Sequence, residues 1–130
     1  MIGFAKFETP EGEVKMKHIM NLNDTPYNMI KSGRKTIELR LYDEKRRMIS
    51  IGDEIEFVNS KDSTLSLHCK VLNLHRFASF QELYKELPLL KCGYTEKDIH
   101  IASPSDMDLY YSKEKQEKYG VIGIELQLTY

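Results

Sequence analysis

Hydrophobic and polar positions alternate along several stretches of this chain, and the alternation predicts its strands. Between residues 35 and 42 the period is two, because Ile37, Leu39 and Leu41 point to one side and the polar residues between them point to the other. The same period predicts strands over residues 18–22, 53–57, 64–77 and 121–129. Within 64–77 the alternation changes phase, which predicts a β-bulge that bends the sheet.

Short helices are predicted between these strands. Asp24-Thr25-Pro26 opens the first, with a capping side chain just ahead of an early proline, and Gly33 closes it. Ser79-Phe80-Gln81-Glu82 has the spacing of a capping box and opens a second helix. Residues 89–120 are predicted to form short helices and turns, the last of them capped by Ser112.

The order of these elements predicts an α+β fold, in which five or six mostly antiparallel strands close into a small β-barrel with short inserted helices. The strand–helix–strand rhythm of a parallel sheet is missing from the pattern. Residues 16–130 are predicted to form one domain, and residues 1–15, which show no clear period, form an N-terminal extension. A chain of 130 residues is long enough to bury its own core without disulfide or metal support.

The charge of the chain is unevenly distributed. The net charge is −1, which by itself does not favour a polyanion partner. Residues 31–47, however, hold seven basic and three acidic side chains, a local excess of four positive charges. A basic segment of this kind fits either a solvated loop or a contact with a polyanion, so other evidence has to decide between them.

Several classes of protein are excluded by the sequence. No apolar run approaches the roughly 18 residues of a membrane span, and the N-terminus lacks a secretory signal, so we predict a cytoplasmic protein. Cys69 and Cys92 show no Cys-x-x-Cys spacing and are predicted to be reduced and non-catalytic. The histidines show no ligand spacing and no glycine loop of a phosphate-binding type is present, so neither a metal nor a cofactor is expected.

The most informative chemistry lies in Gly33-Arg34-Lys35-Thr36-Ile37-Glu38-Leu39-Arg40. Glu38 and Arg40 are two positions apart on a strand and share a face, which Lys35 can reach from the start of the strand. A carboxylate between two cations stays ionised. This trio fits a salt-bridged surface strand, but it also suits nucleic-acid recognition, because arginine and lysine bind phosphates and a carboxylate accepts from base amino groups.

The spacing Gly-x-Lys-x-x-Glu-x-Arg resembles the signature of ASCH domains, with Gly33, Lys35, Glu38 and Arg40 at its four positions. The strand and helix before the motif, the Gly52-Asp53 turn after it and the terminal strand also resemble compact bacterial members, over residues 16–130. The resemblance implies a PUA-like β-barrel with a cleft beside the motif, and RNA or a nucleoside or nucleotide as the partner.

The resemblance also implies an alternative function. A few family members are similar to amidohydrolases that remove acyl groups from N4-acylated cytidine, in which the lysine matching Lys35 acts beside a threonine. Glu38 stands in place of that threonine here. The binding function is therefore preferred, and Lys35 and Glu38 are the expected catalytic residues only if the chain is a hydrolase. A protein-interaction domain that uses the edge of the barrel is a third hypothesis.

Tyrosines are expected to complete the site. Tyr42 shares the face of Glu38 and Arg40, where it can either stack on a base or pack at the edge of the barrel. Tyr110 and Tyr111 precede the last strand, in a region that can cover the cleft. The residues predicted to bind nucleic acid are Lys31, Arg34, Lys35, Glu38, Arg40, Tyr42 and Tyr111.

Overall fold

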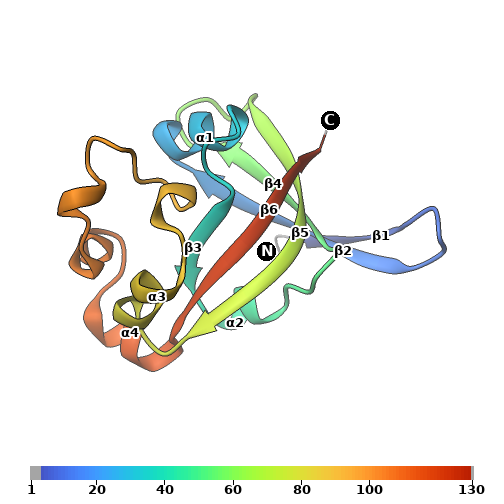
Figure 1. The fold of residues 1–130 in the computed structure, drawn as a ribbon. Helices are drawn as coiled ribbons and strands as arrows, with labels where there is room; N and C mark the ends of the chain where they lie inside the picture. The colour runs from blue at the N-terminus through green and yellow to red at the C-terminus, as the bar shows by residue number, and fades with distance from the viewer. Residues whose placement is uncertain (1–3, 130) are drawn as a thin grey trace.

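A computed structural model describes residues 4–129 and shows a curved six-stranded sheet with helices packed beside it (Figure 1). The α+β class is therefore confirmed. The strands are β1 (Phe4–Glu8), β2 (Val14–Leu22), β3 (Ile37–Leu41), β4 (Glu54–Asn59), β5 (Ser66–Phe77) and β6 (Val121–Thr129).

The sheet is mixed. Its strands follow the order β1-β2-β4-β5-β6-β3, and β2 pairs with β4 in parallel while the other four pairings are antiparallel. A parallel pair needs a crossover connection, and the chain between β2 and β4 supplies it by way of the first helix and β3. The predicted bulge in β5 is confirmed, because its pairing with β6 shifts register between Val71 and Asn73.

The predicted closed barrel is wrong. The two ends of the sheet are β1 and β3, and no described strand pairs β3 with β2. Along residues 14–18 of β2, the edge that would face β3 already carries β1. Further along, a side chain makes the connection, since Arg40 Nη2 donates to the carbonyl oxygen of Asn21 at 2.7 Å. The sheet therefore stays open at this point.

Helices fill the connections between the strands. Figure 1 shows that the later helices gather beside β3, on the side away from the β1–β2 hairpin. The α-helices are α1 (Asp24–Lys31), α2 (Glu44–Arg47), α3 (Phe80–Glu86) and α4 (Lys113–Tyr119), and the 3-10 helices are η1 (Leu89–Lys91), η2 (Ile99–Ile101) and η3 (Pro104–Leu109).

The local signals for these helices hold with one exception. Gly33 follows α1 with a φ of 82°, a conformation that glycine adopts without steric cost. Ser79 and Ser112 cap α3 and α4 as predicted, by accepting from backbone amides of the first turn. The exception is the start of α1, where Asn23 is the N-cap and makes no side-chain cap bond; the Asp24 carboxylate instead accepts from the side chain of Asn59 at 3.0 Å.

The N-terminal residues join the sheet. β1 pairs with β2 from Phe4 opposite His18 to Glu8 opposite Val14, so most of the predicted extension forms a hairpin with the first strand of the domain. The division between residues 15 and 16 remains a prediction. Residues 1–3 and residue 130, which belong to the two predicted segments, lie outside the described residues.

Two hydrophobic cores meet at β3. One lies inside the curve of the sheet and is built around Phe57, Ile55 and Ile124. The other lies between β3 and α3, where Ile37, Leu39 and Leu41 pack against Phe80 and Leu83. β3 was predicted to be half-buried, but it is covered on both faces, because the segment from α3 to α4 folds over the side that Ile37 faces.

Candidate functional site

Lys35, Glu38 and Arg40 form a connected ionic trio on the inner face of β3. Lys35 Nζ lies 2.8 Å from Glu38 Oε1, and Arg40 Nε donates to Glu38 Oε2, also at 2.8 Å. The three residues meet because Glu38 and Arg40 share one face of the strand and Lys35 approaches from the turn after Gly33. The sequence prediction that brought these three together is confirmed by these distances.

Their burial differs from the prediction. The trio was expected on an exposed strand face, but Glu38 is only 4% exposed and Lys35 only 9%. Burial alone would raise the pKa of Glu38, yet Lys35 and Arg40 together hold that pKa at about 2. Glu38 is therefore ionised throughout the physiological range, and breaking the trio would leave buried charge unpaired.

Arg40 also ties the trio to β2. Its guanidinium contacts Glu38 through Nε and the carbonyl oxygen of Asn21 through Nη2, so it is held by two different elements. Burial alone would lower the pKa of Arg40, but the Glu38 carboxylate raises it above the ordinary value. Two fixed contacts of this kind hold the guanidinium in one orientation.

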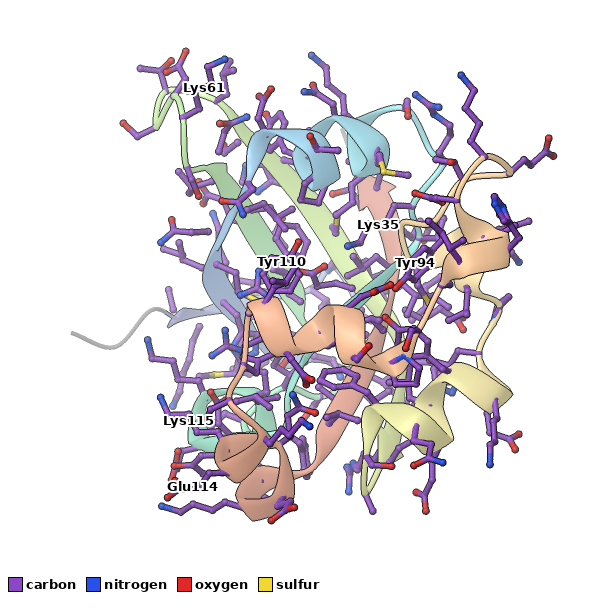
Figure 2. All side chains as sticks on the ribbon, turned by 90° about the vertical axis from the view of Figure 1, so that its left-hand side faces the viewer. Lys35, Lys61, Tyr94, Tyr110, Glu114 and Lys115 are labelled. Carbon is purple, nitrogen blue, oxygen red and sulfur yellow. The ribbon has the colours of Figure 1, made fainter. Side chains whose placement is uncertain are left out.

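A cleft of about 720 Å³ opens over the trio, within the size range of small-ligand sites. We call it the motif cleft. Residues from α1 and the end of β2 form one wall, and residues from η3 and the loop after η1 form the other. Figure 2 views this side of the molecule, with Lys35 between Tyr94 and Tyr110. Besides the trio, its lining includes Asn21, Pro26, Met29, Tyr84, Cys92, Tyr94, Asp106, Leu109, Tyr110 and Tyr111.

One wall carries a chain of phenol groups. Tyr94 donates to Asp106 Oδ2 at 2.6 Å, and its oxygen lies 2.7 Å from the hydroxyl of Tyr84. Because Tyr94 gives its proton to Asp106, Tyr84 must be the donor to Tyr94. Burial, and then the bond to Asp106, raise the pKa of Tyr94, so the chain stays neutral. It presents a fixed polar wall to the cleft.

Sequence reasoning missed Tyr84, Tyr94 and Asp106. They come from α3, from the loop after η1 and from η3, and no period or motif connects three such segments. The only available signal was the number of tyrosines between residues 84 and 111, which is four.

The other predicted binding residues divide into two groups. Tyr111 lines the motif cleft and stacks on Phe80, with ring centroids 6.2 Å apart. Lys31 and Arg34 are exposed and do not line it. Tyr42 also lies outside the lining, since it packs against the inner core and below Arg47, whose guanidinium carbon is 4.3 Å from the ring centroid. For Tyr42 the packing alternative is the one that the structure supports.

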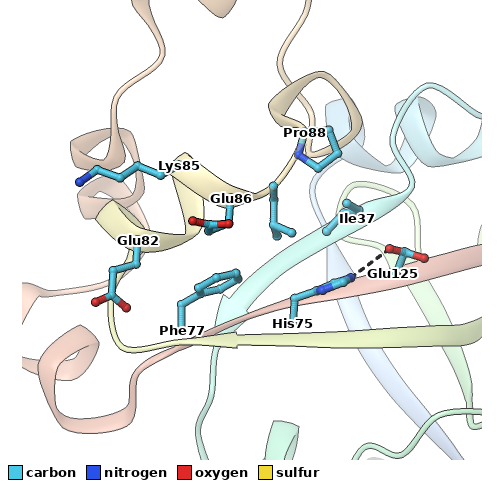
Figure 3. Close-up of a pocket in the computed structure, with 9 residues that line it drawn as sticks. Ile37, His75, Phe77, Glu82, Lys85, Glu86, Pro88 and Glu125 are labelled. Carbon is cyan, nitrogen blue, oxygen red and sulfur yellow. Dashed lines mark hydrogen bonds and ion pairs between the residues drawn. The ribbon is translucent and has the colours of Figure 1, made fainter.

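A second groove, of about 760 Å³, lies on the other side of β3, below α3 (Figure 3). We call it the outer groove. His75 and Glu125, whose side chains are 3.0 Å apart, stand at one end of it, and Phe77 and Leu87 contribute apolar surface. None of the motif's charged residues lines the outer groove, so the motif cleft is the candidate site.

The cysteines and the metal-binding residue types add no further chemistry. Cys69 and Cys92 are buried free thiols, and burial raises their pKa values to about 12 and about 11, which makes them poor nucleophiles at neutral pH. Among residues 4–129, no three His, Cys, Asp or Glu side chains gather closely enough to hold a metal ion. In the same part of the chain, every helix is too short or too polar to span a membrane.

Comparison with known proteins agrees with the motif. The family model of the ASCH domain matches residues 20–129. Among solved structures, the hypothetical protein PH0355 is 34% identical with a TM-score of 0.72, and the alignment covers 88% of this chain and all of that one. Protein PF0455 from Pyrococcus furiosus is also 34% identical, with a TM-score of 0.64 and coverage of 87% and 97%.

A more distant likeness concerns the fold alone. The ASCH protein from Zymomonas mobilis is 12% identical, with a TM-score of 0.60, and the alignment covers 85% of this chain and 66% of that one. Among proteins with curated functions, no relative matches this chain. The family model spans the motif, β3, the cleft walls and the terminal strand, and so this chain belongs to the ASCH domain family.

Proposed function

We propose that this protein binds RNA, and that the motif cleft holds part of the RNA against Lys35, Glu38 and Arg40. The observation that carries the proposal is a buried trio with one excess positive charge at the base of a cleft. Membership of the ASCH family supports it, because these PUA-like domains are generally RNA-binding. A cytoplasmic location remains a prediction.

The trio keeps donors free for a ligand. In the contacts described among residues 4–129, Glu38 accepts from one of the three ammonium hydrogens of Lys35. Glu38 and the Asn21 carbonyl each accept from one of the five N–H groups of Arg40. The remaining donors suit a phosphate or a base carbonyl. Because Glu38 fixes both cations, they need little reordering when the ligand binds, which lowers the entropic cost of binding.

Hydrolysis of an N4-acylated cytidine remains an alternative prediction, and one observation weighs against it. In this alternative Lys35 is the base and Glu38 orients the water molecule, but both oxygens of Glu38 already contact cations at 2.8 Å. Incubation of the wild-type protein with N4-acetylcytidine tests this alternative, since released cytidine that disappears in both Lys35→Ala and Lys35→Arg would establish catalysis.

Changing Lys35 tests the binding function. We expect Lys35→Ala to weaken the binding of a fluorescein-labelled random 20-mer RNA about ten- to a hundredfold in an anisotropy titration, because alanine cannot make the charge-assisted hydrogen bond. Lys35→Arg keeps the charge and should retain most of the affinity. Lys70→Ala, at an exposed position on β5 outside the cleft, is the matched control. Equal affinity of the wild type and Lys35→Ala would refute the proposal.

A further inference from the structure

The rim of the motif cleft carries two apolar side chains that the fold leaves in solvent. Leu109 is 86% exposed and Tyr110 is 64% exposed, and both line the same cleft as Lys35. Isolated apolar side chains on a surface need no explanation. An adjacent aliphatic and aromatic pair at the mouth of a charged cleft is different, because it extends the binding surface beyond the trio.

The backbone that holds this pair is firmly anchored. η3 begins with a capping box between Ser103 and Asp106, and the same Asp106 carboxylate accepts from Tyr94. At the other end of η3, the amides of Tyr110 and Tyr111 both donate to the carbonyl oxygen of Met107, each at 3.1 Å. The exposed pair is therefore held in position before any ligand binds.

The two neighbouring tyrosines lie at different depths. Tyr111 is directed inward, where it stacks on Phe80, whereas Tyr110 stays at the surface. Their ring centroids are 6.5 Å apart and the rings are tilted by 55°. Because Tyr110 is 64% exposed and does not stack on Tyr111, it has ring surface to offer to another flat group.

We propose that the motif cleft takes one nucleotide and that Tyr110, supported by Leu109, stacks on the base of the next nucleotide. This inference rests on the proposed function and specifies its ligand as a single strand rather than a free nucleoside or mononucleotide. Aromatic side chains bind single strands in this way because every base has a π-face, whereas bases inside a duplex are already stacked on their neighbours.

Charged groups on the same face agree with a longer ligand. Figure 2 shows Lys61 near the top of this face and Lys115 near its bottom, next to Glu114, with Tyr110 between the two lysines. Both lysines are exposed. Lys61 offers a cation to the phosphates of a strand that leaves the cleft toward it, whereas the charge of Lys115 is partly offset by Glu114.

A length series tests the inference. We expect isothermal titration of 5′-adenosine monophosphate, the adenylate dinucleotide and the adenylate tetranucleotide to show affinity that rises about tenfold from the mononucleotide to the dinucleotide, which is the scale of one stacked base. Tyr110→Ala should abolish this rise, so that the dinucleotide binds no more tightly than the monophosphate. Tyr110→Phe keeps the ring and should keep the rise.

The outcomes separate the inference from the function on which it rests. A flat length series in the wild type, combined with monophosphate binding that Lys35→Ala abolishes, would overturn the stacking inference alone. A rise that persists in Tyr110→Ala would do the same. If adenylates of all three lengths fail to bind, or bind equally well to Lys35→Ala, both the proposed function and this inference fail. Because Tyr110 is exposed, we expect its variants to melt within a few degrees of the wild type.

Discussion

Two buried carboxylates in this protein are held by different partners. Asp53 is 2% exposed and Glu38 is 4% exposed. The Asp53 oxygens accept from the backbone amides of Met16 and Ser50 and lie 2.9 Å from His18 Nε2. Among residues 4–129, the contacts of the Glu38 oxygens are with two side-chain cations, Lys35 and Arg40.

The difference shows which of the two clusters is suited to a ligand. The hydrogen bonds of Asp53 connect β2 to the turn before β4, and Asp53 lines neither the motif cleft nor the outer groove. These bonds therefore stabilise the fold. Glu38 orients two cations that still have donors to offer and that face a cleft. Burial of a carboxylate therefore does not identify a functional site, and the proposed site rests instead on unused donors at the surface of a cleft.

Removing Asp53 should have the largest effect, and it should fall on stability. Asp53→Ala removes the acceptor of two part-buried amide hydrogen bonds and of the buried contact with His18, so we expect the free energy of unfolding to fall by about 3 to 5 kcal/mol in urea denaturation. Asp53→Asn, which keeps one acceptor oxygen, should lose less. RNA affinity of the folded fraction should stay within about twofold of the wild type. An Asp53→Ala variant with normal stability but weakened RNA binding would contradict the structural role of Asp53.

Neutralising Glu38 should lower stability in a pH-dependent way. The pKa of Glu38 is about 2 in the folded protein, against 4.5 for an ordinary glutamate, so its contribution is complete above about pH 4.5 and is lost as the pH falls toward 2. The shift corresponds to roughly 3 kcal/mol. We expect the free energy of unfolding of Glu38→Gln to be lower than that of the wild type at pH 7. At pH 2.5 the two values should be nearly equal.

Urea unfolding at a series of pH values measures this effect. Glu56→Gln is the matched control, because Glu56 forms a more exposed ion pair with Lys17, 3.0 Å away, which solvent screens. If the difference in the free energy of unfolding between Glu38→Gln and the wild type stays constant from pH 7 to pH 2.5, the ion pairs of Glu38 do not stabilise the fold.

The smallest expected effect is on the salt dependence of RNA affinity, and it tests whether the basic residues of α2 contact phosphates. Lys45 on α2 is exposed, and the neighbouring Arg46 pairs with Asp43 at 3.3 Å. If this segment binds phosphates, RNA affinity should fall with rising salt, and Lys45→Ala combined with Arg46→Ala should reduce the slope of log affinity against log salt by about 0.7 for each phosphate no longer neutralised. Affinity of the wild type that is unchanged between low and high salt would exclude phosphate binding by this segment.

The motif itself could be predicted from the sequence. The glycine turn and the period of two place Lys35, Glu38 and Arg40 together, because both are local properties of the backbone. The period did not decide between the two alternatives for Tyr42, which has the parity of Glu38 and Arg40 but follows the last residue of β3. Its amide bonds to Gly120 and its ring packs against the inner core and below Arg47, outside the cleft.

What covers the trio, and whether the sheet closes, depended on the tertiary structure. The sequence by itself determined the strands from β2 to β6, the caps of α3 and α4, the bulge and the motif, each through interactions between residues close together in the chain. The burial of Glu38, the wall of Tyr84, Tyr94 and Asp106, and the open edge beside β3 arise from segments far apart in the sequence. The hydrophobic effect that packs those segments is non-directional, so the local pattern shows that a surface must be covered but not which segment will cover it.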